Sequence, residues 1–370
     1  MKVYVYPADT DGCGYYRMMW PATALQLQGH DVTIVLPKER NEGGDPRLQI
    51  SGDIRGRDEL LNLRFPEDAD VVVLQRVTSR VLCQGIAMMR ARGVAVVIDM
   101  DDDLSSIDPW HPARYYLDPR NDLDHMWTCA ERACRDATLV TVSTPPLLKT
   151  YARHGRGVVL YNHVLREMSQ VERPVTKRFG WTGSLHSHPR DPQVVGPAVQ
   201  RLVREGFEFA MIGNTRGVAI PGANNPTTVR EAFGLEEDPW TTGAVPIQQW
   251  AAALANLRVG IAPLSDTKFN RAKSWLKPLE LAALGIPCVS SPLPEYVRAN
   301  ELGIGVLAKE SRDWYRQIKR LLTDDAWYAE VAERSRAAAA ELVLEDRAHL
   351  WWDAWTRAYE METEKSPATV

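Results

Sequence analysis

The sequence predicts an α/β fold made of two doubly wound, Rossmann-like domains. Short runs rich in β-branched residues alternate with longer amphipathic runs, which is typical of parallel sheets covered by helices on both faces. The chain has 370 residues, which suits two domains of about 100 to 200 residues each. The polar segment 162–178 has no sustained periodicity, and it separates two such alternating series.

The first series contains five continuous apolar runs that we interpret as buried parallel strands. In chain order they are KVYVY, DVTIVL, DVVVLQR, VAVVID and TLVTVS. The second series contains RFGWTGS, FEFAMIG, RVGIAPL, IPCVSS and IGVL. Helical patterns lie between the runs, and one of them ends on Gly93, as a helix C-cap does. We therefore place the first domain at 1–165 and the second at 166–345, and we expect a tryptophan-rich amphipathic helix within 346–370.

The charge, the cysteine content and the hydropathy of the chain limit the kinds of partner and compartment to expect. The formal net charge of -4 and the pI of about 6.1 give no strong signal for nucleic acid, so any anion site must be local. Five cysteines without paired spacing suggest a reducing, cytoplasmic compartment. No stretch approaches the roughly 20 apolar residues of a membrane helix, and the N-terminus soon becomes polar. We expect neither a spanning segment nor a cleaved signal, while peripheral contact with a membrane stays open.

A cationic loop precedes an apolar helix in the stretch KFNRAKSWLKPLELAALG. Proline is tolerated only in the first turn of a helix, so Lys277, before Pro278, should lie close to the N-cap. The free N–H groups of that turn, together with Lys273 and Lys277, form an anion pocket for which phosphate is the best candidate. Glu280 lies one turn further and can accept two hydroxyl hydrogen bonds, as from a ribose. The alternative is an ordinary solvated helix end.

A glycine loop follows the first predicted strand in DGCGYYR. Gly12 and Gly14 invite comparison with a dinucleotide fingerprint, but Arg17 replaces the third glycine and no acid ends the second strand, so NAD or FAD binding is not expected. The glycines instead allow a phosphate or an acceptor to approach, with Arg17 pointing into the cleft. The alternative is a tight turn that leaves Arg17 on the helix surface.

A second glycine loop follows RFGWTGS. Gly183 and Ser184 offer backbone amides to a phosphate, and His186, His188 and Arg190 come directly after them. Two histidines flanking one residue, without further nearby ligands, form only a weak metal signal.

The run FNRAKSWLKPLELAALGIPCVSS resembles the nucleotide-sugar motif of GT-B glycosyltransferases similar to glycosyltransferase family 4, in a variant typical of glycosyltransferases predicted in bacteria and actinobacterial phages. RFGWTGSLHSHPRD and DGCGYYRMMWPATALQLQGHDVTIVLP look like the strands and glycine loops that begin the two domains of such enzymes. The resemblance implies an acceptor-side domain and a nucleotide-sugar-binding domain that face across a cleft, with the helix in 346–370 crossing back to the first. It implies a retaining hexosyltransferase that moves a sugar from a nucleotide-diphosphate donor to a hydroxyl of an unknown glycan, lipid or protein, without a cofactor.

Three consecutive acids end the fourth predicted strand in VVIDMDDDLSSIDPWHP. Family 4 enzymes often place a His-Asp pair at this strand end, facing the transferred sugar. Asp-x-Asp can also hold a divalent cation on a sugar diphosphate, but a cationic phosphate pocket needs no metal, so we expect none. The alternative for these acids is a helix N-cap in a solvated turn. His111 and His125 follow, and either one could replace the missing histidine.

The family pattern implies roles for individual residues. Lys273 and Lys277 stabilise the departing diphosphate, and Asp102 is the preferred catalytic acid of the cleft. The expected donor-binding residues are Gly14, Arg17, Gly183, Ser184, Arg190, Ser274, Trp275, Leu276 and Glu280. Asp101, Asp103 and His111 are expected in the acceptor and sugar cleft.

One position departs from the family motif. Glu280 matches the second glutamate of its Glu-x7-Glu element, but Ala272 occupies the place of the first, which in the family contacts the sugar. Asp266 is an alternative sugar contact. The departure leaves open a nucleotide-sugar epimerase of the same fold, and an inactive nucleotide-sugar-binding or scaffold protein.

Overall fold

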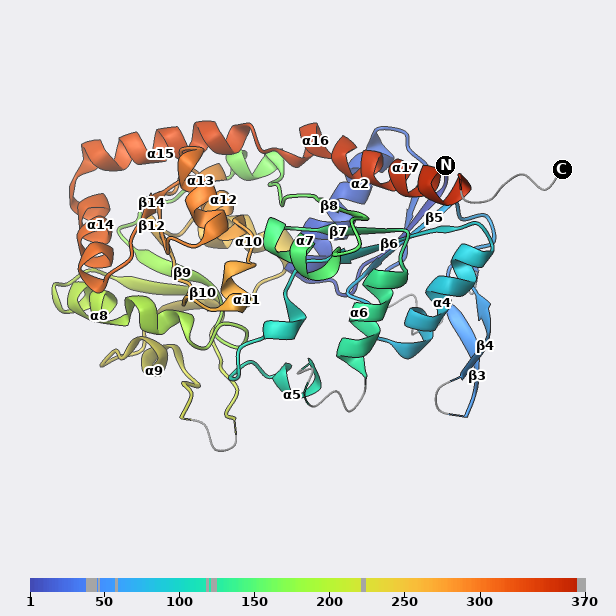
Figure 1. Cartoon of the computed structure of the whole chain (residues 1–370). Coiled ribbons are helices and arrows are strands. Elements are labelled where there is room, and N and C mark those ends of the chain that lie inside the picture. The colour runs from blue at the N-terminus through green and yellow to red at the C-terminus, as the bar shows by residue number, and fades with distance from the viewer. Residues whose placement is uncertain are drawn as a thin grey trace. The chain divides into compact units, whose positions relative to one another are not determined.

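The computed structural model describes residues 1–37, 45, 47–56, 59–117, 120, 125–220 and 224–364, which fold into two compact units (Figure 1). Unit 1 comprises Met1–Ser106, Tyr115–Asn162 and Leu344–Val370, and unit 2 comprises Ile107–Arg114 and His163–Val343. The chain therefore passes between units after residues 162 and 343, where the sequence suggests 165 and 345. The segment 107–114 belongs to unit 2, although it lies within the predicted first domain.

Unit 1 is built on a six-stranded parallel sheet in the order β2-β1-β5-β6-β7-β8. The strands are β1 Val3–Tyr6, β2 Val32–Ile34, β5 Val71–Gln75, β6 Ala95–Met100, β7 Leu139–Val142 and β8 Gly157–Val159. Every residue of β1, β5, β6 and β7 is buried, which confirms the interpretation of the continuous apolar runs as strands covered on both faces. The chain leaves β1 toward β2 and returns on the other side as β5. The carboxyl ends of β1 and β5 thus form the switch point at which such sheets bind ligands.

The helices of unit 1 lie between its strands and at the C-terminal end of the chain. They are α1 Gly12–Gly14, η1 Tyr15–Met19, α2 Trp20–Leu27, α4 Arg80–Ala91, η2 Leu104–Ser106, α5 Arg114–Leu117, which begins on the last residue of the unit 2 segment, α6 Met126–Asp136, α7 Pro145–Tyr151, α16 Leu344–Arg347 and α17 His349–Thr363. The α1, η1 and α2 segments form one continuous helical run whose middle turn is a π-helix. Pro21, which has no N–H to donate, follows that turn after Trp20.

A two-stranded antiparallel hairpin adds to unit 1 and was not predicted. It consists of β3 Ser51–Arg55 and β4 Glu59–Arg64. Only Leu60 and Leu63 of β4 are buried, so the apolar alternation that marks a half-buried strand is weak in this sequence.

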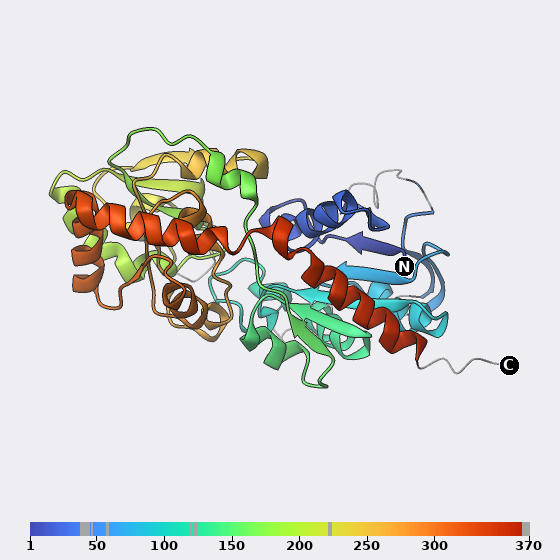
Figure 2. The same ribbon diagram turned by 90° about the horizontal axis from the view of Figure 1, so that it is seen from above.

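The C-terminal helix α17 packs on unit 1, as expected of a helix that crosses back to the first domain. Trp351 and Trp355 are buried, and the indole N–H of Trp351 donates to the carbonyl of Arg17 at 3.1 Å. Glu362 receives hydrogen bonds from Arg90 at 2.8 Å and from Thr138 at 2.6 Å. Figure 2 shows α17, in red, beside the strands of the unit 1 sheet. The described residues include no helix that is long and apolar enough to cross a membrane.

Unit 2 contains a second six-stranded parallel sheet, in the order β11-β10-β9-β12-β13-β14. The strands are β9 Phe179–Ser184, β10 Phe209–Asn214, β11 Trp240–Gly243, β12 Val259–Ala262, β13 Cys288–Ser290 and β14 Val306–Leu307. All five predicted strands of this half are confirmed. The edge strand β11, in which no residue is fully buried, was missed.

Helices cover the unit 2 sheet. They are η3 Arg166–Gln170, α8 Asp191–Arg204, α9 Val229–Phe233, α10 Ile247–Leu254, α11 Lys268–Arg271, α12 Leu276–Ala283, α13 Pro294–Glu301, α14 Ser311–Thr323 and α15 Asp325–Ala340. One core packs around the rings of Trp181, Phe209 and Phe233 between the sheet, α8, α9 and α14, and a second core lies against α10, α12 and α13. These cores fix the carboxyl ends of β9 and β12, where the candidate site lies.

Candidate functional site

The helix that carries Lys277 begins two residues earlier than its proline suggests. Trp275 is the N-cap of α12, so Lys277 and Pro278 both lie in the first turn, where proline is tolerated. The preceding stretch is not a plain loop, because α11 occupies Lys268–Arg271 and is capped by Thr267, whose hydroxyl accepts from the Asn270 N–H at 3.1 Å. The cationic stretch is therefore held between two helices rather than left free in solvent.

Lys277 points back toward strand β9. Its ammonium is buried, finds no hydrogen-bond partner among the described residues, and lies 5.6 Å from the centroid of the Trp181 ring. A Cβ added to Gly183 would lie only 3.1 Å from the ammonium nitrogen, so this glycine leaves room for the lysine. Burial lowers the pKa of Lys277 to about 8, and the charge of Asp191 opposes that shift. A buried cation without a hydrogen-bond acceptor is what a site for an external anion provides.

Lys273 lies on the same side of unit 2. Its ammonium is 4.4 Å from the Phe269 ring centroid, and its charge lowers the pKa of Lys277. The exposed Arg271 and Asp266 pair with each other through hydrogen bonds of 2.5 and 2.8 Å. Because Arg271 already pairs with the Asp266 carboxylate, Asp266 is less available for the sugar contact that the sequence offers as an alternative.

Glu280 is buried on α12, and the indole N–H of Trp250 donates to its Oε1 at 2.9 Å. One carboxylate oxygen therefore has a partner within unit 2. Ala272, at the place of the missing glutamate, is also buried. Trp275 is 1% exposed, and the Arg298 guanidinium lies over its ring at 4.7 Å. The expectation that the Trp275 side chain binds the donor is therefore wrong, and only its backbone stays a candidate. Ser274 and Leu276 are half-buried beside it.

Asp191, the first residue of α8, organises the loops around Lys277, and the sequence analysis missed it. One of its carboxylate oxygens accepts hydrogen bonds from the Ser265 N–H at 2.9 Å, the Ser265 hydroxyl at 2.8 Å and the Asn270 amide at 2.7 Å. The other accepts from Nδ1 of His188 at 2.7 Å. A buried carboxylate with four donors ties the β9–α8 loop to the loop after β12. An acid at a helix start next to a proline was the only signal in the sequence.

The segment 107–114 supplies further residues to this site. Asp108 lies 3.3 Å from Nε of Arg190, and the Arg190 guanidinium stacks over Trp110 at 4.6 Å. Arg190 is thus held by two partners at the start of α8. The Ser184 hydroxyl accepts from the Ser187 N–H at 3.3 Å.

His111 lies in the segment 107–114 of unit 2, near the residues of this site. Its ring lies 6.2 Å from that of His186 and 6.5 Å from that of Phe269. Burial first, then the charges of Lys273 and His186, lower its pKa to about 4. The Ala113 N–H donates to Nδ1 at 3.0 Å, so the neutral ring carries its proton on Nε2.

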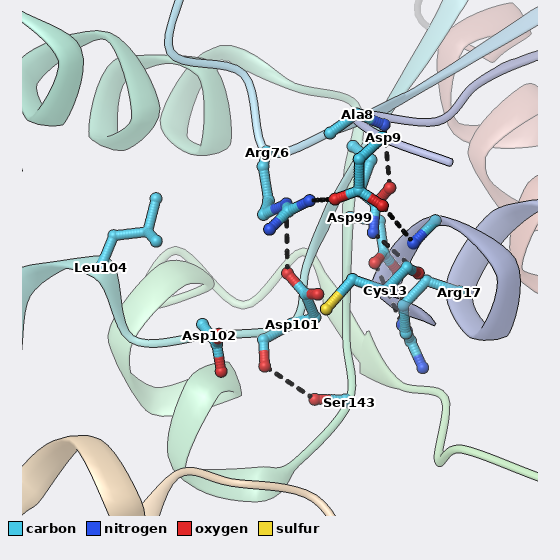
Figure 3. Close-up of polar contacts among 12 residues, drawn as sticks. Ala8, Asp9, Cys13, Arg17, Arg76, Asp99, Asp101, Asp102, Leu104 and Ser143 are labelled. Carbon is cyan, nitrogen blue, oxygen red and sulfur yellow. Dashed lines mark hydrogen bonds and ion pairs between the residues drawn. The ribbon is translucent and has the colours of Figure 1, made fainter. Parts of the chain in front are cut away.

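Unit 1 has a second polar cluster at its switch point (Figure 3). Asp9 follows β1, Arg76 follows β5 and Asp101 follows β6. Arg76 hydrogen-bonds Asp9 and approaches Asp101 at 3.6 Å, and its backbone has a positive φ of 47°, which is unusual outside glycine. Figure 3 shows the Cys13 sulfur beside Asp101, and burial, followed by that carboxylate, raises the pKa of the thiol.

Two predicted donor ligands in this unit are corrected. The Gly14 N–H donates to Asp9 at 3.0 Å, and a Cβ at Gly14 would lie 2.0 Å from the Asp9 carbonyl, so the glycine serves close packing. Arg17 is 1% exposed and binds Asp99 through hydrogen bonds of 3.1 and 2.7 Å. It also donates to the Leu160 carbonyl and to Asn162. Arg17 is neither in a cleft nor on the helix surface but inside the core.

The acidic run divides into different roles. Asp103 accepts hydrogen bonds from the Ser105 N–H at 3.2 Å and its hydroxyl at 2.5 Å, which is the capping alternative. Its predicted place in the cleft is therefore corrected. Asp102 is half-buried, and Tyr151 donates to its backbone carbonyl at 3.1 Å, not to its carboxylate. Asp102 remains the candidate for a substrate contact.

We expect Asp102→Asn to lower the turnover of the sugar transfer that the motif resemblance implies by at least tenfold. The melting temperature of the variant should stay near that of the native protein. Asp103→Ala should do the opposite, costing about 1 kcal/mol of stability, as lost caps do, with turnover preserved in the folded fraction. Thermal melting and initial rates on both variants separate the roles. Equal rates in Asp102→Asn and the native protein would mean that this acid belongs to a solvated turn and has no role in turnover.

Comparisons with known proteins agree with this fold. Residues 176–324 match the family model described as Glycosyl transferases group 1. The crystal structure of Anabaena Alr3699/HepE in complex with UDP and glucose aligns with a TM-score of 0.63 at 14% identity, covering 95% of this chain and 98% of that chain. Sucrose-phosphate synthase from Thermosynechococcus elongatus aligns with a TM-score of 0.63 at 12% identity, covering 97% and 100%. An alpha-glucosyltransferase in complex with UDP-glucose and DNA containing an abasic site gives 0.62 at 14% identity, covering 96% and 99%.

Comparison with curated proteins gives no significant match. At the identities above, structural likeness establishes the fold, and the chain has the GT-B fold with two Rossmann-like domains. Within the described ranges, no group of three or more His, Cys, Asp or Glu residues is arranged to hold a metal ion.

Proposed function

We propose that this chain is a glycosyltransferase that transfers a sugar from a nucleotide-diphosphate donor to a hydroxyl acceptor. The observation that carries the proposal is the buried Lys277 ammonium, which has no hydrogen-bond acceptor among the described residues and lies in the first turn of α12. As the first turn of a helix, it also has backbone N–H groups without intrahelical acceptors and the positive end of the helix dipole. A diphosphate would supply the missing acceptors.

In this proposal the site acts on the leaving group. Negative charge builds on the diphosphate as the bond to the sugar breaks, and Lys277, Lys273 and the amides at Ser274 to Leu276 stabilise it. Glu280, whose Oε1 accepts from Trp250, is proposed to accept a ribose hydroxyl as well, because a carboxylate can accept several hydrogen bonds. Asp102 is the proposed catalytic acid of unit 1.

The finer assignments rest on the motif resemblance and remain part of the proposal. They are retention of configuration, transfer of a hexose, membership of family 4 in its bacterial and phage variant, and independence of metal and cofactor. The lysine charges support metal independence because they neutralise a diphosphate directly. All five cysteines are free thiols, which supports a reducing, cytoplasmic compartment. The UDP and UDP-glucose complexes of Anabaena HepE make uridine donors the first to test.

The test is a panel of UDP-, GDP- and ADP-sugars with the purified chain. We expect one nucleoside diphosphate to bind, and its sugar to be transferred or slowly hydrolysed, at rates unchanged by EDTA. Loss of activity in EDTA with rescue by magnesium or manganese would contradict the metal-independent version. Binding without turnover would favour the scaffold alternative, and turnover of donor into an isomer without acceptor would favour the epimerase. No binding by any member would overturn the proposal.

Donor use should weaken as the pH rises through about 8, the pKa to which burial lowers Lys277. The ammonium is present below that pH and is lost above it, and kcat/KM reports such groups in the free enzyme. The kcat/KM for donor should therefore decline above that pH. Lys277→Arg keeps its charge, so its profile should stay flat there whatever its absolute rate. A flat profile for the native protein would remove the Lys277 charge from donor binding.

A further inference from the structure

His188 has a fixed orientation at the edge of the Lys277 site. It lies in the loop between β9 and α8, and its own N–H donates to the Ser184 carbonyl at 3.0 Å. Its Nδ1 is 2.7 Å from an oxygen of Asp191, and the imidazole is 11% exposed. His188 lines a small hollow, whose walls also include Asp108, Arg190, Asp191, Ser265, Phe269 and Asn270. The ring is therefore held in place while still forming part of a surface.

The partners of His188 decide which nitrogen carries the proton. Although burial opposes the shift, the hydrogen bond with His188 lowers the pKa of Asp191. The carboxylate is therefore ionised at neutral pH and only accepts, which makes Nδ1 the donor. Burial first, and then the charge of Lys277, lower the pKa of His188 to about 3, while Asp191 opposes them. At neutral pH the ring is neutral, and its Nε2 carries a lone pair that can only accept.

An accepting Nε2 on His188 does not suit recognition of a phosphate. A neutral Nε2 and a phosphate oxygen both carry lone pairs, so they repel one another. The nearby cations Lys273, Lys277 and Arg190 are donors that suit phosphate. A hydroxyl, in contrast, can donate to Nε2. The buried Ala272, at the place where the motif resemblance implies a glutamate, has no side-chain acceptor.

We propose that His188 accepts a hydrogen bond through Nε2 from a hydroxyl of the transferred sugar, and that Asp191 is the positioning residue that holds the imidazole in this tautomer. The inference rests on the proposed function, because it needs a sugar nucleotide in the Lys277 site. The β9–α8 loop would then recognise the sugar, and His188 would supply an acceptor in place of the glutamate that is absent at Ala272.

The test separates the sugar from the nucleotide. UDP binding to His188→Ala, measured by calorimetry, should stay within about twofold of the native protein, while kcat/KM for UDP-glucose should fall by about tenfold, the typical effect of one lost hydrogen bond. His188→Gln should recover part of the loss, because its amide oxygen can accept from the same hydroxyl. His154→Ala is the control, since His154 is a half-buried histidine of unit 1 whose nitrogens are bonded to Cys134 and Arg156.

Mono-deoxy analogues of UDP-glucose identify the hydroxyl. For one analogue, native protein and His188→Ala should be equally poor, because the donor of the hydrogen bond is already missing. The inference would be overturned if His188→Ala weakened the binding of UDP as much as the use of UDP-glucose. It would also be overturned if His188→Ala lowered kcat/KM by the same factor with every analogue as with UDP-glucose. If UDP-glucose binds without turnover, dissociation constants replace kcat/KM in the same comparison. Failure of the native protein to bind any nucleoside diphosphate would instead defeat the proposed function, and this inference with it.

Discussion

Lys277→Met is expected to lower kcat/KM for donor by roughly a hundredfold or more and to raise the stability of unit 2. The loss follows from removing the cation that faces the diphosphate, since charged groups aimed at developing charge contribute about 10²- to 10³-fold. The gain follows from burial: an unbranched apolar side chain fits the space beside Gly183 without the cost of desolvating an ammonium. Replacing buried charges with apolar groups of similar volume often stabilises by about 1 to 4 kcal/mol.

The pH dependence of this gain has a definite sign. Folding lowers the pKa of Lys277 from 10.5 to about 8, so between those values the unfolded chain binds more protons and the native protein becomes more stable as the pH rises. The advantage of Lys277→Met should therefore be largest below pH 8 and shrink above it. Urea unfolding and steady-state kinetics on the same preparations measure both effects. Lys177→Met, at an exposed lysine of the linker, is the control. A variant that loses stability and keeps its donor kinetics would make Lys277 a structural residue.

Arg17→Met should destabilise unit 1 by about 3 to 5 kcal/mol, the usual effect of leaving one member of a buried ion pair alone. The stranded partner is Asp99, which is fully buried and, among the described residues, keeps only the Thr141 hydroxyl, at 2.7 Å, as a side-chain donor. Burial already raises the pKa of Asp99, and loss of Arg17 should raise it further. Because a protonated Asp99 carries no charge, the stability lost in Arg17→Met should be smaller at acidic than at neutral pH.

The double variant Arg17→Met with Asp99→Asn is the matched control, because it removes the stranded charge and keeps an acceptor for Thr141. It should recover a large part of the stability. Denaturant midpoints give the free energies of unfolding, and UDP calorimetry on the folded protein should show little change in either variant. A stable Arg17→Met protein with weakened UDP binding would restore the phosphate role that the sequence suggests for this arginine.

The sequence by itself determined the continuous apolar strands of both sheets and the start of α12, although it missed β3, β4, β8 and β11. Runs such as VVVLQ and AVVIDM are apolar throughout because both faces of a parallel strand are covered, and that requirement is visible without knowing what covers them. Pro278 placed the start of α12 to within one turn, since proline restricts its own backbone and that of its neighbour. Lys277, Gly183 and Glu280 could be proposed as site residues because they lie at fixed distances in sequence from these local signals.

Only the tertiary structure decided which polar groups face one another. Arg17 meets Asp99 across 82 residues of sequence, and Asp191 meets Asn270 across 79, so no local pattern can pair them. The segment 107–114 joins unit 2 through Asp108, Trp110 and His111, although its neighbours in sequence belong to unit 1. The physical reason is that secondary structure depends on backbone and neighbour preferences, whereas the partner of a buried charge depends on how the strand ends and helix starts dock.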